Sequence, residues 1–246
     1  MASSISKSVA RAFEVLECFK DTRVPYTASE ITRRLNYPHS SGVAVLKVLT
    51  DLGYLTYDRI KRTYFPAQKL HRLGIWVQSA LIGSSGLTDT AQAICQETGE
   101  TTAITSRSFI FNHIIHVQKP QRPLAIDLPV GVGIALCNSI VGRVILSQMS
   151  DKEVERIYRF TTFWAKKQKT QPVPPFDDVV RAVAFVRKNN FLAGYDQWLE
   201  GVGAVAFPLK APFEGYPLAI GVSGPTPRIR AAEANLRRTM ARILKV

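Results

Sequence analysis

Small polar and basic side chains recur at helical spacing between Ser40 and Lys47. When the apolar residues of this segment turn inward, the face that remains consists of Ser40, Ser41, Ala44 and Lys47. Serine hydroxyls bond phosphates or base edges, an alanine methyl can contact a thymine methyl, and lysine reaches phosphate or guanine. The spacing therefore predicts that these side chains face duplex DNA.

Further basic side chains, Arg59, Lys61 and Arg62, gather between two β-rich stretches. Such cations suit phosphate or minor-groove contacts, which add affinity but little sequence information. Arg33 on the preceding short helix, and Thr27 at the start of that helix, complete the set expected at DNA. The alternative is a domain of the same fold that binds protein.

Two polar loops that enter helices are candidates for anion binding. In residues 137–143, Asn138 or Ser139 can cap a helix, and in residues 222–227, Thr226 can cap the last helix. Free N–H groups and the helix dipole favour negative charge at a helix N-terminus. If the two loops meet across the edge of a sheet, they form a carboxylate-binding site without a buried lysine.

Other residues with potential chemistry fit no catalytic or metal site. His113 and His116 point to opposite faces of the strand expected to contain them. Cys137 is expected to be a buried apolar thiol, since no histidine lies in an adjacent motif. The Gly-Val-Gly at residues 131–133 lacks the third glycine of a dinucleotide site. We expect no catalytic residues, no metal and no cofactor.

The elements of residues 1–78 position the side chains expected at DNA. The pattern predicts helices at 6–19, 27–35 and 40–53 and strands at 54–57 and 63–65. Thr27 and Glu30 form a capping-box pattern at the second helix. Two helices joined by a short turn, with a hairpin after them, indicate a winged helix-turn-helix.

Two of these helices carry apolar stripes that are expected to face the core. The stripe of the first helix is Val9, Phe13, Leu16 and Phe19. The stripe of the third helix is Val43, Leu46, Leu49 and Leu52.

A connecting helix carries a third apolar stripe, at Leu70, Leu73, Val77 and Leu81. A connector between domains has no reason to be this apolar unless it buries against something, and a symmetric partner is the simplest candidate. The stripe therefore predicts a homodimer. The alternative is packing onto the helix's own domain.

Residues 79–246 predict an α/β domain around an antiparallel sheet, because hairpin-linked strands alternate with helices. The expected helices are 87–98, 139–148, 151–160, 177–189 and 228–244. The expected strands are 101–107, 109–118, 123–128, 202–209 and 217–222. The charged run 166–169 is expected to be a solvated loop. With the N-terminal domain, the fold class is α+β.

The composition excludes several classes of protein. The chain has 246 residues, of which 46% are hydrophobic and 21% charged, so it is neither a disordered chain nor a coiled coil. Its longest uncharged stretch, 73–88, is too short and polar to cross a bilayer, and residues 1–20 lack the apolar core of a secretory signal. We therefore expect a cytoplasmic protein without membrane contact.

The charge balance favours a polyanionic partner such as double-stranded DNA. Lys and Arg number 32 against 19 Asp and Glu, a net charge of +13. Residues 1–80 hold 12 of the basic and 6 of the acidic side chains, and the remainder holds 20 and 13, so both parts are basic.

Several runs of residues resemble the IclR family of bacterial transcription regulators. They are the run 6–16, the run Ala28-Ser29-Glu30-Ile31, the run 49–55 and the run Leu70-His71-Arg72-Leu73-Gly74. The resemblance covers nearly the whole chain and implies a GAF-like C-terminal domain that binds an effector. It also implies dimers formed through the DNA-binding half, often paired into tetramers through the other half. Ala44 and Gly42 depart from the residues usual in the family, so no operator sequence is inferred.

The resemblance also implies which residues surround an effector. By position these are Ser139, Ile140, Val141, Ala204 and Ser223. Ile140 and Val141 replace the usual glycine and alanine, which enlarges the apolar share of the site.

Independently of the resemblance, Tyr195, Asp196 and Trp198 precede the approach to this site and could supply an aromatic wall. We expect a small organic acid with an apolar or aromatic body.

Together these patterns predict a regulator whose DNA binding responds to a ligand, and not an enzyme. Two alternatives stay open at this point. One is a small-acid-processing enzyme that the winged helix recruits to DNA, and the missing acid–base pair argues against it. The other is a DNA-binding protein that responds to no ligand.

Overall fold

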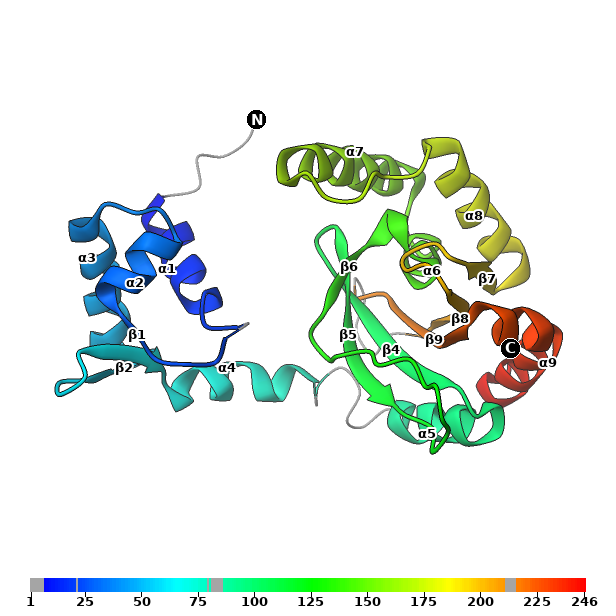
Figure 1. Ribbon diagram of the computed structural model, residues 1–246. Coiled ribbons are helices and arrows are strands. Elements are labelled where there is room, and N and C mark those ends of the chain that lie inside the picture. Colours follow the sequence, from blue (N-terminus) through cyan, green and yellow to red (C-terminus); the bar gives the residue numbers. More distant parts are fainter. Residues whose placement is uncertain (1–6, 21, 79, 81–85, 211–215) are drawn as a thin grey trace. The chain divides into compact units, whose positions relative to one another are not determined.

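The computed structural model describes the chain apart from residues 1–6, 21, 79, 81–85 and 211–215. Its contacts divide the chain into two compact units, Met1–Val77 and Gln78–Val246. Each unit is built around its own elements (Figure 1) and is described by itself. Among the helices of the described part, none has the length and hydropathy needed to cross a membrane.

The N-terminal unit is a helical domain closed by a small antiparallel sheet. Its helices are α1 (Lys7–Glu17), α2 (Ala28–Arg34) and α3 (His39–Asp51), and α4 (Gln68–Gln78) follows. Strands β1 (Tyr26–Thr27), β2 (Leu55–Asp58) and β3 (Thr63–Pro66) pair in the order β1-β3-β2. The core residues are Val15, Phe19, Tyr26, Ile31, Leu46, Leu49 and Leu55. The predicted winged helix-turn-helix is therefore confirmed, with β1 as an addition.

Helix α2 begins at the predicted capping box. The Oγ1 atom of Thr27 accepts a hydrogen bond from the Glu30 N–H at 3.3 Å, and the Thr27 N–H donates to Oε2 of Glu30 at 2.8 Å. The bond from the Thr27 backbone is the main cause that lowers the pKa of Glu30. Local sequence alone thus sets the start of this helix.

Helices α2 and α3 meet at a residue without a side chain. A Cβ atom on Gly42 would lie 2.2 Å from Cγ2 of Thr32, which is buried and donates its hydroxyl to the Ala28 carbonyl at 2.9 Å. Thr32 therefore fills the space that a larger residue at position 42 would need. The close approach holds α3 against α2.

Two apolar stripes lie differently from the prediction. On α1 the core side is marked by Val15, with Phe19 just beyond the helix, whereas Val9 and Phe13 are 53% and 63% exposed. At the end of α3, Leu52 is also exposed. Apolar residues cover a wide arc of α1, so their spacing alone did not show which part of the arc faces the core.

The C-terminal unit is an antiparallel sheet with helices on both faces (Figure 1). The helices are α5 (Leu87–Thr98), α6 (Ile140–Leu146), α7 (Asp151–Gln168), α8 (Phe176–Asn189) and α9 (Thr226–Leu244). The strands are β4 (Thr101–Ser108), β5 (Phe111–Gln118), β6 (Gly133–Ala135), β7 (Leu192–Tyr195), β8 (Val202–Leu209) and β9 (Leu218–Pro225). Their order is β6-β5-β4-β9-β8-β7.

Strand residues alternate between two cores, as the pleat of a strand requires. On β8, Val205 and Phe207 pack in the core that includes α5 and α9, whereas Ala206 packs in the core that includes α6, α7 and α8. On β9, Leu218 and Ile220 belong to the first core. The predicted α/β domain with an antiparallel sheet is confirmed.

Some predicted elements of this unit are wrong. Residues 123–128 form no strand, and β6 pairs with β5 in its place. The charged run 166–169 is not a loop, because α7 continues to Gln168 and ends at Lys169, whose φ is 52°. Strands β6 and β7, three and four residues long, are too short to produce a clear alternation in sequence.

The predicted cap of the last helix is also wrong. Pro225 occupies the N-cap position of α9, and Thr226 is the first helical residue. No side chain caps the helix, and the Thr226 hydroxyl instead donates to Oδ1 of Asp196 at 2.9 Å. The cap predicted for α6 is confirmed, because Oγ of Ser139 accepts from the Gly142 N–H at 3.0 Å.

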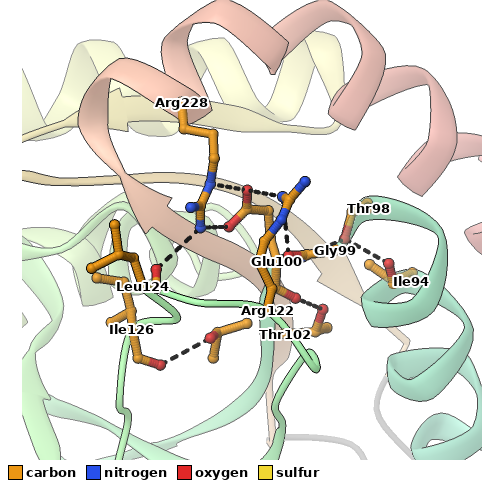
Figure 2. Close-up of polar contacts among 10 residues, drawn as sticks. Ile94, Thr98, Gly99, Glu100, Thr102, Arg122, Leu124, Ile126 and Arg228 are labelled. Atoms are coloured by element: carbon orange, nitrogen blue, oxygen red, sulfur yellow. Dashed lines mark hydrogen bonds and ion pairs between the residues drawn. The ribbon is translucent and has the colours of Figure 1, made fainter.

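A buried carboxylate fastens the loop after β5 to helix α9 (Figure 2). Glu100 is 3% exposed, and its Oε1 and Oε2 accept from Nε and Nη2 of Arg228 at 2.5 and 2.7 Å. Nη1 of Arg122 lies 3.2 Å from Oε1 of the same carboxylate. Arg228 also donates to the carbonyl of Leu124 at 3.3 Å. The site that Glu100 occupies requires Gly224, because a Cβ there would lie 2.4 Å from Oε2.

Substituting Glu100→Gln is expected to destabilise the folded chain by about 2–3 kcal/mol, because Arg122 and Arg228 lose their buried anionic partner. Both arginine side chains remain partly exposed to solvent, which limits the loss. Urea unfolding followed by circular dichroism measures this. Asp127→Asn is the matched control, since Asp127 pairs with Lys119 in the same loop with both side chains more than half exposed. It is expected to change stability by less than about 1 kcal/mol. Equal effects of the two substitutions would contradict the assignment.

Candidate functional site

The outward face of α3 carries the residues predicted to meet DNA. Ser40, Ala44 and Lys47 are exposed. Ser41 is half-buried, and its hydroxyl accepts a hydrogen bond from Nη1 of Arg11 on α1. The Arg11 guanidinium also lies 4.8 Å from the ring centroid of Tyr37. Arg11 therefore sits beside this face, and sequence spacing did not point to it.

The start of α3 adds backbone donors to the same face. Helix α3 begins at His39 after Pro38, and no side chain caps it. N–H groups in the first turn of an uncapped helix, at the positive end of its dipole, suit contact with a phosphate. The arrangement fits docking of the N-terminal half of α3 on duplex DNA.

The wing places three exposed cations at its tip, between β2 and β3. Oδ1 of Asp58 accepts from the N–H groups of Ile60 and Lys61 at 2.8 and 3.0 Å, which turns the chain. These bonds, that of Lys61 first, lower the pKa of Asp58. Arg62 follows with a φ of 53°. Arg59, Lys61 and Arg62 are all exposed.

The remaining predicted DNA contacts differ in availability. Arg33 is exposed on α2. Thr27 is half-buried, and its hydroxyl both accepts from the Glu30 N–H and donates to Oε2 of Glu30 at 2.8 Å. The structure therefore gives Thr27 a capping role within the domain.

A cavity of about 60 Å³ lies in the C-terminal unit, lined by the sheet and the start of α6. It exists because the strand residues beneath it are small, among them Ala103, Ala204 and Gly221. The lining residues are Ala103, Thr105, Asn112, Ile114, Leu128, Ile134, Ser139, Ile140, Val141, Gly194, Gln197, Trp198, Leu199, Val202, Ala204, Gly221 and Ser223.

Polar groups gather along part of this lining. Ser139 donates its hydroxyl to Oδ1 of Asn112 at 3.1 Å, and both residues are buried. Ser223 is buried as well. Thr105 is 2% exposed, and its Oγ1 has no hydrogen-bond partner in the described part of the chain. A buried hydroxyl without a partner is costly, and a bound molecule can supply the missing bond.

The remaining lining is apolar and tightly fitted. A Cβ on Gly194 would lie 2.2 Å from Cδ1 of Ile140, and one on Gly221 would lie 3.1 Å from Cγ2 of Val141. The two branched side chains that depart from the family pattern are therefore accommodated by glycines on β7 and β9. They narrow the cavity instead of displacing α6.

The structure brings six of the eight predicted effector residues together. Ser139, Ile140, Val141, Trp198, Ala204 and Ser223 line the cavity. Tyr195 and Asp196 do not. The Tyr195 hydroxyl donates a hydrogen bond to Oε2 of Glu233. Burial, and secondly this hydrogen bond, raises the pKa of Tyr195 to about 12. Asp196 accepts from the Gly201 N–H at 2.7 Å and from Thr226, so both side chains serve the packing of α9.

Thr105 and Asn112 were missed from sequence. They lie on different strands, and β4 and β5 change register between Ile104 and Thr105. This irregularity and the distance along the chain hide their proximity. Strand β4 reads TTAITSRS, so Thr105 is one polar residue among several and no sequence signal marked it.

The thiol of Cys137 is not poised for catalysis. Burial is the main cause that raises its pKa to about 11, and its sulfur lies 3.9 Å from Oγ1 of Thr161. In the described residues, no group of three His, Cys, Asp or Glu side chains is placed to hold a metal ion. The candidate site is therefore the exposed face of α3 with the wing in one unit and the cavity in the other.

Comparison with known proteins agrees with this division. Residues 8–59 match the IclR helix-turn-helix domain, and residues 86–245 match the bacterial transcriptional regulator IclR C-terminal domain. The chain is 24% identical over 236 residues to the Pca regulon regulatory protein of Pseudomonas putida, covering 94% of this chain and 78% of the relative.

Solved structures share the fold. An IclR family transcriptional regulator from Brucella abortus aligns with a TM-score of 0.75 at 20% identity, over 98% of this chain and 91% of that one. An IclR homologue from Microbacterium hydrocarbonoxydans, complexed with 4-hydroxybenzoate, aligns with a TM-score of 0.67 at 19% identity, over 97% and 98%. Because two family domains together cover most of its length, this chain belongs to the IclR family, whose members are transcriptional regulators and not enzymes.

Proposed function

We propose that this regulator binds its operator through the exposed face of α3 and the wing, and that a small organic acid in the cavity alters the affinity for DNA. The observation that carries the ligand proposal is the unpartnered hydroxyl of Thr105 in a buried, largely apolar cavity. The Thr105, Ser139 and Ser223 hydroxyls offer hydrogen bonds to a polar head. The apolar walls, with the indole of Trp198 among them, suit a flat body.

The class of ligand follows from what lines the cavity. Its lining residues include no lysine, arginine or histidine, so a carboxylate there would rely on hydroxyl and N–H donors. The apolar lining favours an acid with an apolar body over a two-carbon acid, and at about 60 Å³ the cavity must widen to admit a ring. The structural relative complexed with 4-hydroxybenzoate makes that acid a rational first probe.

We also propose that the chain acts as a homodimer in the cytoplasm. A groove of about 700 Å³ in the N-terminal unit is lined by apolar residues of α1, α3 and α4, among them Phe13 and Leu73. These two side chains are 63% and 54% exposed, and the family dimerises through this half. Leu81 of the predicted stripe lies outside the described residues. Pairing of dimers into tetramers remains a family expectation.

In a dimer, two copies of α3 enter successive major grooves about 34 Å apart. An effector changes DNA binding only if it binds one arrangement of the dimer more tightly than another. A DNA-binding protein without a ligand is the remaining alternative, and it would show no specific stabilisation by any acid.

Lys47→Ala and Arg62→Ala are each expected to weaken DNA binding by about 1–3 kcal/mol. Each should also reduce the slope of the logarithm of the binding constant against the logarithm of the salt concentration by about 1. Lys47→Ala should lose more sequence preference. The probe is a duplex selected from a random pool by the wild-type protein, measured by fluorescence anisotropy at several salt concentrations. Lys152→Ala on α7 is the control. Unchanged binding by both α3 and wing variants would contradict this docking.

Thr105→Val is expected to weaken binding of the preferred acid by about 1 kcal/mol, because it removes one hydrogen bond at nearly constant shape. The free protein should be equally or more stable, since an unpaired buried hydroxyl is lost. Thermal shift with 4-hydroxybenzoate, benzoate and glyoxylate reads both effects, and Thr162→Val on α7 is the control. Stabilisation by glyoxylate but by neither aromatic acid would refute the proposal that the effector is an acid with an apolar body.

Leu73→Glu is expected to convert the dimer to monomer, because it places a charge in the apolar groove. Ile75→Glu is the matched control and is expected to leave the dimer intact, since Ile75 is 56% exposed on the same helix and does not line the groove. Light scattering after size-exclusion chromatography gives the mass of each variant. A dimer that withstands Leu73→Glu, or dissociates equally with Ile75→Glu, would contradict the proposed interface.

A further inference from the structure

A buried arginine on α6 is left over after the effector cavity has been assigned. Arg143 is 8% exposed, and its Nε donates to the Cys137 carbonyl at 3.1 Å. No carboxylate of the described residues pairs with it, and none of them bonds its terminal nitrogens Nη1 and Nη2. Burial lowers its pKa, while the charges of Cys137 and Asp178 oppose that shift. Nη1 and Nη2 are not among the buried atoms without a partner, so they reach solvent and are available to donate.

Arg143 lines an open groove of about 580 Å³ that is separate from the cavity. The rest of its lining is formed by Asn138, residues 171–175, the loop 196–198 and Glu200. Arg143 does not line the cavity, and Thr105 does not line the groove. Trp198 lines both.

A second polar group at this groove also lacks a partner. Nδ2 of Asn138 donates to the Pro172 carbonyl at 2.8 Å, whereas its buried Oδ1 has no partner among the described residues. Asn138 is 9% exposed. The groove thus combines a cation with free donors and a buried amide oxygen that accepts a hydrogen bond only from a donor group on a ligand or from water.

The rim restricts the charge of the ligand. Asp196 and Glu200 line the groove together with Arg143, so the side chains carry two negative charges against one positive. These two carboxylates repel any anion and repel a dianion more strongly than a monoanion, so a single carboxylate that engages the fork of Arg143 is the anion least opposed here. Three prolines, at 172, 174 and 175, and the indole of Trp198 offer flat apolar surfaces.

We propose that this groove is a second small-molecule site, in which Arg143 binds the carboxylate of a monoanion with a flat apolar body. The site lies beyond the effector cavity and does not depend on what fills that cavity.

The experiment is a titration of the full chain with 4-fluorobenzoate, followed by fluorine NMR. Two bound environments are expected. Glu200→Gln, at an exposed position on the groove rim, should tighten the groove environment by about two- to threefold by removing a repelling charge. Gln171→Glu should weaken it, and Arg143→Gln should abolish it. Thr105→Val serves as the complementary variant, and it is expected to weaken only the bound environment that belongs to the cavity.

Several outcomes overturn the proposal. They are the absence of a second environment, a second environment that Glu200→Gln and Gln171→Glu leave unchanged, and displacement by inorganic phosphate, which indicates a site for polyanions. If Arg143→Gln unfolds, the two rim variants still decide the question. Loss of the Thr105-dependent environment alone refutes the effector proposal and leaves this one standing.

Discussion

The close packing of α6 against the sheet is the constraint on which the C-terminal unit depends. Almost the whole of this short helix is buried, and a Cβ on Gly142 would lie 2.3 Å from the Leu136 carbonyl oxygen. Glycines at 194 and 221 receive Ile140 and Val141 from the same helix. This packing sets the ceiling of the cavity, aligns Ser139 with Asn112, and carries Arg143 into the neighbouring groove.

Elements defined by local chemistry were predictable. Helix α5 and strand β8 have the predicted bounds, and the Thr27–Glu30 capping box starts α2. In each case neighbouring residues decide the conformation, whether by a hydrogen bond over three positions or by a continuous run of eight residues without a charged or polar side chain. The same reason made Ser139 a sound prediction as a helix cap.

Features decided by distant residues were not predictable. The loop at 123–128 has strand-like composition, yet Arg122 and the Leu124 carbonyl are bound to Glu100 and Arg228, which stand 128 positions apart. Tyr195 and Asp196 are close to Trp198 in sequence, but contacts with α9 take them out of the cavity. The gathering of Thr105 with Ser139 likewise depends on strand pairing that periodicity does not reveal.

The contact between Gly42 and Thr32 has a consequence for the history of this domain. A methyl group of Thr32 occupies the place of a missing Cβ, so neither position can enlarge unless the other shrinks. Relatives with a branched residue at the position of Gly42 should therefore carry alanine or glycine opposite it. The two positions should covary in evolution, and that covariation would report the close approach of the two helices from sequences alone.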